Sequence, residues 1–168
     1  RLCVADVHLA AGRGAARAEA RLRDLEEILW QLSFGRGPAR RSALEHDLLL
    51  VAGDFNFRLG GAGGCEEPPS PEAAREALAG AAPGELAARM EAQGDEGVRL
   101  QRAGRGAWAL LREAPIDFPP TYKFQPGEDA FAPGAAPAWC DRVLWWARPA
   151  RFAAAPLPAG YGRVDGVR

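Results

Sequence analysis

Four consecutive large apolar residues, Leu48 to Val51, constrain the fold most, because such a run predicts a short strand buried on both faces. Gly53 allows a tight turn after this strand, and Asp54 and Asn56 follow one residue apart. Alternate residues of an extended chain point to the same side. A carboxylate and a carboxamide are therefore expected together at the carboxyl end of a core strand, where open α/β sheets usually bind ligands. The alternative is a strand followed by an Asp and an Asn that only form a turn.

The composition fits one globular domain. The chain has 168 residues, of which 48% are hydrophobic and 26% are charged, and this length allows a single sizeable core. The net charge of -1 gives no basic surface typical of a dedicated nucleic-acid-binding protein, so no nucleic-acid partner is expected. No apolar run is long enough to span a membrane. Three cysteines without metal-ligand spacing favour a reducing compartment, and we expect a cytoplasmic protein.

The first half of the chain predicts a strand, a helix and a second strand, which indicates an α/β sheet. Residues 2–9 are predicted to form the first strand, and leucines recur at helical spacing over residues 15–33. Arg21 is assigned to a face of this helix other than the apolar one. Residues 48–53 form the second strand.

The second half predicts shorter elements. Alternating Ala, Glu, Arg and Leu residues predict one or two short helices over 72–92, with a break at the glycines near residue 80. We expect an irregular polar segment over 93–107 and a further strand over 139–145. The remaining predictions are loops over 60–71 and 148–168, the latter with one weak strand, and core positions at Trp108, Leu110 and Leu111.

Several polar residues that could carry out chemistry fall at predicted strand ends or in adjoining loops. Each also has a purely structural interpretation, such as a hydrogen-bonded histidine, an aromatic side chain packed beside a solvated amine, or an ion pair. The candidates are His8, Asp54, Asn56, Arg58, Tyr122, Lys123, Asp141 and Arg142.

The motifs that contain these candidates resemble the inositol polyphosphate 5-phosphatase family. They read Gly53-Asp54-Phe55-Asn56-Phe57-Arg58, Phe118-Pro119-Pro120-Thr121-Tyr122-Lys123-Phe124 and Pro137-Ala138-Trp139-Cys140-Asp141-Arg142-Val143-Leu144-Trp145. Residues 8–12 resemble the histidine-containing strand end of the same family. The similarity runs in the same order through essentially the whole chain.

The resemblance implies a deoxyribonuclease I-like fold of two packed β-sheets flanked by helices, here incomplete at both ends. It also implies a Mg²⁺-dependent phosphatase that removes the 5-phosphate from phosphoinositide lipids or soluble inositol phosphates. Peripheral contact with membranes follows from the lipid substrates. Hydrolysis of a phosphate monoester needs a positioned water, a polarising metal and donors to the phosphoryl oxygens, which agrees with this set of residues.

The resemblance also assigns roles to the candidate residues. Asp54 would orient or deprotonate the attacking water, and Asn56 would hold the water or a phosphoryl oxygen. His8 would donate a hydrogen bond to the scissile phosphate, and Asp141 would orient a partner histidine. The substrate-binding candidates, of which the Tyr-Lys pair is expected to bind the 4-phosphate, are Tyr122, Lys123, Arg58 and Arg142.

Three departures from the family pattern limit the expected activity. The principal Mg²⁺-binding Glu of the family lies in an amino-terminal part that this chain lacks, so no metal ligand is assigned here. The family's Ser-Asp-His, which supplies the histidine partner of Asp141, is expected soon after Tyr161, and the chain ends at Arg168 without it. Residues 131–136 are shortened and uncharged where the family carries basic residues. We therefore expect residues 1–168 to be a partial catalytic domain that is inactive alone.

Two other functions stay open. The near-neutral charge and the motifs disfavour a nuclease of the same fold. A non-catalytic phosphoinositide-binding or scaffold protein, derived from the enzyme, is favoured by the uncharged segment 131–136. The presence of His8, Asp54, Asn56 and Asp141 disfavours it, because binding alone does not need all four residues.

Overall fold

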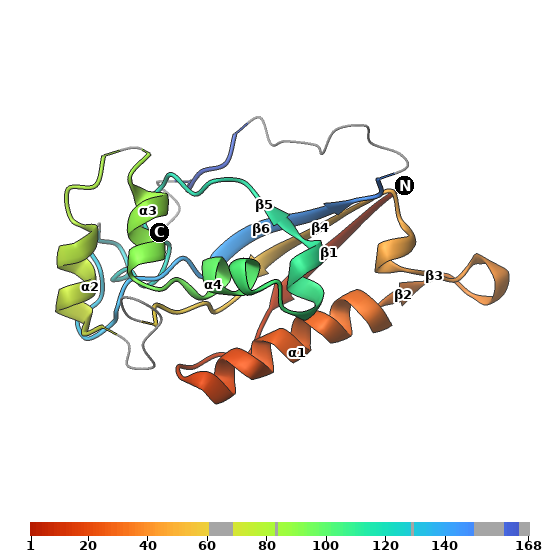
Figure 1. Ribbon diagram of the computed structural model, residues 1–168, viewed down its shortest axis with the longest axis horizontal. Coiled ribbons are helices and arrows are strands. Elements are labelled where there is room, and N and C mark those ends of the chain that lie inside the picture. The colour runs from red at the N-terminus through yellow and green to blue at the C-terminus, as the bar shows by residue number, and fades with distance from the viewer. Residues whose placement is uncertain (61–68, 83, 129, 150–159, 165–168) are drawn as a thin grey trace.

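A mixed four-stranded sheet in the order β1-β4-β6-β5 forms the centre of the fold (Figure 1). This computed structural model describes residues 1–60, 69–82, 84–128, 130–149 and 160–164. The strands β1 and β4 pair in parallel, whereas β6 is antiparallel to both β4 and β5. The strands span Leu2–His8 for β1, Leu48–Asp54 for β4, Arg112–Glu113 for β5 and Asp141–Ala147 for β6.

The helix α1, Ala15–Gln31, connects the two parallel strands and packs along one face of the sheet (Figure 1). Its apolar residues follow the helical spacing seen in the sequence, and Leu22, Leu25 and Leu29 are buried. They pack in one cluster with the inward side chains of β1 and β4. The predicted strand-helix-strand order and the α/β class are confirmed.

A small hairpin lies between α1 and β4. It pairs β2, Ser33–Phe34, with β3, Arg41–Ser42, and two 3-10 turns accompany it over Gly37–Ala39 and Ala43–Glu45. Figure 1 shows the hairpin at the end of the sheet opposite to the helices α2 and α3.

Three short helices precede β5. The two predicted over 72–92 are α2, Pro71–Leu78, and α3, Leu86–Ala92. The third, α4, spans Glu96–Ala103, so the prediction of an irregular segment over 93–107 is wrong. The Asp95 side chain caps α4 by accepting a hydrogen bond from the Val98 amide, and Gly104 ends the helix in a left-handed conformation.

The buried residues form two apolar clusters. The larger one lies between the sheet, α1 and the 3-10 turn Gly106–Leu110, whose Trp108 is fully enclosed. The smaller one gathers Ala74 of α2, Leu86 and Met90 of α3, and Trp139. Leu111 is buried as predicted, but the Leu110 side chain is exposed, so its assignment to the core is wrong.

The second face of the sheet is more open than the run of apolar residues suggests. Leu48 and Leu50 of β4 are only half-buried, and Leu2, Val4 and Val143 on the neighbouring strands are exposed. No described helix is long and apolar enough to cross a membrane. The loop predicted over 60–71 and the weak strand predicted in 148–168 fall mostly outside the described residues.

Candidate active site

Three candidate residues, His8, Asp54 and Asp141, meet at one end of the sheet because of the strand register. We call this end, where β1 and β4 finish and β6 begins, the edge. His8 is the last residue of β1, Asp54 the last of β4 and Asp141 the first of β6. His8 pairs with Asp54 across the parallel ladder, and Asp54 pairs with Asp141 across the antiparallel one. The three residues are therefore adjacent although they lie far apart in the sequence.

His8 and Asp54 form the central pair of this edge. The Nε2 atom of His8 lies 3.5 Å from Oδ2 of Asp54, and the two side chains are 75% and 31% exposed. A carboxylate at this distance can orient an imidazole and can also accept a proton from a water molecule. The pair is open to a ligand because the imidazole is largely in solvent.

Gly53 allows the two strands to approach at this point. Its φ is 134°, and a Cβ atom added there would collide with the carbonyl oxygen of Val7 on β1. A side chain would therefore push the strands apart one residue before His8 and Asp54 pair. The sequence placed Gly53 at a turn, and the structure adds this close contact between strands.

Asn56 organises the turn that follows β4. Its backbone N–H donates to Oδ1 of Asp54 at 2.7 Å, which is the turn-forming interaction expected of an Asp two residues upstream. Its φ of 54° is left-handed, a conformation that Asn tolerates better than most residues. The buried carboxamide donates from Nδ2 to the Leu9 carbonyl at 3.0 Å and accepts from Nη2 of Arg58 at 2.7 Å. Asp54 and Asn56 therefore form a turn, and both also belong to the candidate site.

Arg58 and Tyr122 extend the edge on one side. The guanidinium of Arg58 stacks over the Tyr122 ring, with 4.3 Å from Cζ to the ring centroid. Tyr122 is held by a pair of backbone hydrogen bonds with Ala138. Lys123 is exposed, and its carbonyl accepts a hydrogen bond from the Ala132 amide at 2.8 Å. The uncharged segment 131–136 thus folds back onto the lysine.

The structure does not bring Arg142 to this edge. Its side chain is 1% exposed and forms ion pairs with Asp95 at 3.1 Å and with Glu113 at 2.6 Å. Burial lowers the pKa of Arg142, but the two carboxylates outweigh that effect, so the pKa is raised and the guanidinium stays charged. Neighbouring strand residues point to opposite faces, and Asp141 faces the edge while Arg142 faces the interior. This placement gives Arg142 a structural position and not the predicted contact with substrate.

A second buried ion pair supports the loop after His8. Arg21 was assigned to an outer face of α1, but its side chain is 1% exposed and pairs with Glu96 at the start of α4. Its Nη1 also donates to the carbonyl oxygens of Ala10 and Gly12, each at 2.9 Å. The sequence could have predicted the burial of Arg21, because this residue lies one helical turn before Leu25 on the buried face of α1.

A hollow of about 300 Å³ opens beside Asp141. Its walls include Thr121, Tyr161 and Arg163, of which the last two did not emerge from the sequence as site residues. The Tyr161 hydroxyl donates to Oε1 of Glu113 and accepts from the Val143 amide, both at 3.0 Å. Burial, followed by the charge of Glu113, raises the pKa of Tyr161, so this hydroxyl stays protonated. Tyr161 therefore fixes the wall of the hollow against β6.

The edge offers only part of a metal site. Among the described residues, no three His, Cys, Asp or Glu side chains gather closely enough to hold a metal ion. Mg²⁺ is commonly held by one or two carboxylates together with water and substrate phosphates. Asp54 and Asp141 are the described carboxylates at this edge that fit such a role.

Known proteins are similar to this chain in both sequence and fold. Residues 1–155 match the endonuclease/exonuclease/phosphatase family 2. A phosphatidylinositol 4,5-bisphosphate 5-phosphatase of Saccharomyces cerevisiae is 32% identical over 147 residues, which cover 86% of this chain and 14% of that protein. A type II inositol 1,4,5-trisphosphate 5-phosphatase of Mus musculus is 29% identical over 150 residues, again 86% and 14% of the two chains. The chain thus spans only a small part of these relatives.

A solved structure agrees with these matches. The inositol polyphosphate 5-phosphatase domain of SPsynaptojanin, in complex with inositol (1,4)-bisphosphate and a calcium ion, is 32% identical, with a TM-score of 0.68. The similarity covers 87% of this chain and 39% of that one. It confirms the predicted deoxyribonuclease I-like α/β fold for this part of the domain. By sequence, the chain belongs to the endonuclease/exonuclease/phosphatase family 2, and the relatives named above are inositol polyphosphate 5-phosphatases.

Proposed function

We propose that the protein containing this chain removes the 5-phosphate from phosphoinositide lipids or soluble inositol polyphosphates. The observation that carries this proposal is the strand register that aligns His8, Asp54 and Asp141 at one edge. The loop with Tyr122 and Lys123 adjoins this edge, because the Asp141 amide donates to Thr121 Oγ1 at 3.3 Å. The names of the relatives agree, since each acts as a 5-phosphatase on an inositol phosphate or an inositol lipid.

In the proposed reaction, the oxygen of a water molecule attacks the 5-phosphorus and the bond from phosphorus to the inositol oxygen breaks. The products are inorganic phosphate and an inositol hydroxyl group, whose oxygen takes up one proton for the one that the attacking water loses. Asp54 orients the water and accepts its proton, and the hydrogen bond from the Asn56 amide fixes that carboxylate. His8 donates a hydrogen bond to a phosphoryl oxygen from its position beside Asp54.

Asn56 and Asp141 take the remaining roles. The Asn56 carboxamide is held by Leu9 and Arg58, so its free hydrogen-bonding capacity is presented in a fixed orientation to the water or a phosphoryl oxygen. Asp141 orients a second imidazole. Neither histidine of this sequence pairs with Asp141 among the described residues, so the proposal places that imidazole outside this sequence.

The metal, the cellular location and the extent of the domain complete the proposal. When bound, Mg²⁺ would supply Lewis-acid chemistry for the hydrolysis; Asp54 and Asp141 would help to hold it, and its principal carboxylate ligand is expected outside this sequence. Residues 1–168 form the central to carboxyl-terminal part of the catalytic domain and are inactive alone. The complete protein is cytoplasmic and contacts membranes peripherally, where lipid substrates are found. Tyr122, Lys123 and Arg58 contact the substrate.

The test is phosphate release by the complete protein in the presence of Mg²⁺. Inositol 1,4,5-trisphosphate and vesicles that contain phosphatidylinositol 4,5-bisphosphate are the substrates, and inositol 1,4-bisphosphate is the control without a 5-phosphate. We expect release from at least one substrate and none from the control. The Asp54→Ala variant is expected to keep its fold and lose turnover. A complete protein that binds the lipid vesicles but releases no phosphate would instead be a scaffold protein.

A further inference from the structure

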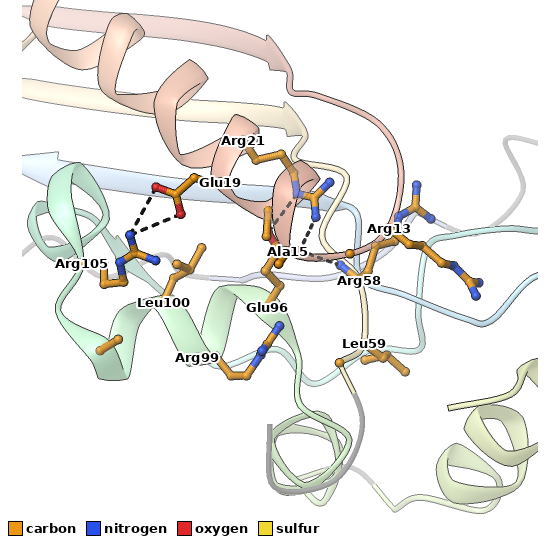
Figure 2. Close-up of a pocket in the computed structure, with 14 residues that line it drawn as sticks. Arg13, Ala15, Glu19, Arg21, Arg58, Leu59, Glu96, Arg99, Leu100 and Arg105 are labelled. Atoms are coloured by element: carbon orange, nitrogen blue, oxygen red, sulfur yellow. Dashed lines mark hydrogen bonds and ion pairs between the residues drawn. The ribbon is translucent and has the colours of Figure 1, made fainter. Parts of the chain in front are cut away.

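A hollow of about 400 Å³ lies between the start of α1, the residues after β4 and the helix α4 (Figure 2). Arginine is the prevailing charged residue on its walls. We call it the arginine pocket and define it by the side chains of Arg13, Arg21, Arg58, Arg99 and Arg105. Figure 2 shows that these side chains come from α1 with its preceding loop, from the chain after β4 and from the region of α4.

The charge of the arginine pocket is not balanced by its own carboxylates. Five guanidinium groups face two carboxylates, those of Glu19 and Glu96, which leaves an excess of three positive charges. Glu96 pairs with Arg21, and Glu19 pairs with Arg105. The chain as a whole carries a net charge of -1, so this positive charge is concentrated locally. Such a concentration attracts anions.

Three arginines of the pocket, Arg13, Arg58 and Arg99, have no carboxylate partner within the described part of the chain. Arg13 and Arg99 are exposed. The Nε atom of Arg58 is buried and has no hydrogen-bond partner among the described residues. A buried donor without an acceptor costs free energy. The pocket therefore offers several guanidinium donors to a ligand that carries oxygen anions.

Backbone N–H groups also favour an anionic ligand in the arginine pocket. Gly14 and Ala15, at the start of α1, lie on the pocket wall. No side chain caps this helix, and its first turn contains no acidic residue. The amino end of a helix of 17 residues carries partial positive charge and backbone N–H groups suited to an anion.

We propose that the arginine pocket binds a phosphomonoester group as a second anion site, adjacent to the catalytic edge but separate from it. Guanidinium groups bind oxyanions with two parallel hydrogen bonds, which favours an oxyanion over a halide. The excess of positive charge on the walls favours a phosphomonoester, with its higher charge and three terminal oxygens, over a single carboxylate. Arg58 links the two sites, because its Nη2 donates to the Asn56 carboxamide at 2.7 Å while its side chain lines the pocket. The proposed site binds a phosphate group without hydrolysing it, so this proposal adds a binding site to the proposed phosphatase activity.

The phosphate group can come from a soluble inositol phosphate or from a lipid headgroup, and chemical protection separates these sources. The complete protein is treated with phenylglyoxal, which modifies accessible arginines, and each modified residue is measured by mass spectrometry. The probes are inositol 1,4-bisphosphate and phosphatidylcholine vesicles with or without phosphatidylinositol 4-phosphate. Neither phosphorylated probe carries a 5-phosphate, so the proposed reaction cannot consume them.

We expect at least one probe to slow the modification of Arg13 and Arg99 several-fold. Arg23 and Arg36, which are exposed and lie outside the pocket, are expected to react at unchanged rates. Protection by the soluble probe identifies a free inositol phosphate as ligand, and protection by the vesicles identifies a headgroup. Unchanged rates at Arg13 and Arg99 with every probe would overturn the proposal. So would loss of their protection in Lys123→Ala, because the shielding would then come from the catalytic edge.

A pair of charge variants tests the same site by calorimetry with the protecting probe. The double variant Arg13→Glu, Arg99→Glu is expected to lose one of two binding events. The matched control, Arg23→Glu with Arg36→Glu, changes the net charge equally and is expected to keep both. Equal weakening by the two double variants would show that only the overall charge matters and would refute a built site. A protein without turnover that still keeps this binding event would contradict the proposed function and leave the pocket in place.

Discussion

Replacement of Arg142 by Met separates a structural role from a role in substrate binding. The Arg142 guanidinium is the shared partner of Asp95 and Glu113, and all three side chains are at most 5% exposed. Met keeps the apolar stem of the Arg side chain and carries no charge, so Arg142→Met removes the cation and retains the packing of the stem. Two carboxylates then remain buried without a cation.

The expected loss of stability is large. Removal of one partner from a buried ion pair costs about 3–5 kcal/mol, because the remaining charge is buried and uncompensated. Two carboxylates depend on this one guanidinium, which places the expectation toward the upper end of that range. In a domain of this size, each kcal/mol lowers Tm by roughly 2–4 °C, so the variant should melt roughly 6–20 °C below the natural protein.

Urea unfolding, followed by the fluorescence of the buried tryptophans, measures this loss. Adding Asp95→Asn and Glu113→Gln to Arg142→Met removes the uncompensated charges, and Asn at position 95 can still cap α4. We expect this triple variant to recover most of the lost stability. A single variant that loses less than about 1 kcal/mol, the range of an exposed ion pair, would refute the structural role. A KM that stays raised in the triple variant, whose stability has recovered, would return Arg142 to the substrate-binding role.

Three further predictions concern the edge and its surroundings. Gly53→Ala should lower stability by about 1–3 kcal/mol from strain alone and by more from the collision with Val7. Gly14→Ala, which has positive φ and open space, is the control in the same urea assay, and an equal loss would exclude the collision. Burial raises the pKa of the Cys140 thiol from 9.0 to about 12, so the folded state favours the protonated form. This contribution to stability is full below pH 9.0 and is lost as pH rises toward 12, and Cys140→Ala should flatten that decline in urea midpoints. Lys123→Ala should raise KM more for substrates with a 4-phosphate than for those without one, and equal increases would show that this amine does not bind that phosphate.

The sequence predicted the elements whose pattern is strong and local. The apolar run before Gly53 and the leucine spacing of α1 gave β4 and α1 almost to the residue. The helix α4 was missed because it is short, half of its residues are polar, and its buried residues are Glu96 and Gly97 and not large apolar side chains. Its boundaries were nevertheless encoded, since Asp95 is a favourable N-cap and Gly104 a favourable C-terminal residue.

The positions of the candidate residues also divide into those that a local pattern predicts and those that depend on the whole fold. The proximity of Asp54 to Asn56 is local, but that of His8 to Asp141 depends on the order and register of three strands. The spacing of residues within one strand does not predict how that strand aligns with its neighbours. Arg142 was misplaced because its motif was treated as one functional unit, although strand alternation already separates it from Asp141.

The buried ion pairs explain how an exposed edge can keep its geometry. Arg142 joins β6 to the start of α4 and to β5, directly behind Asp141. Arg21 joins α1 to α4 and holds the carbonyl groups of the loop that follows His8. Both networks meet at α4, through Asp95 and Glu96, which are adjacent in the sequence and bind different arginines. The position of α4 therefore couples His8 on β1 to Asp141 on β6. A change at either ion pair is expected to alter the alignment of the edge without touching a residue on it.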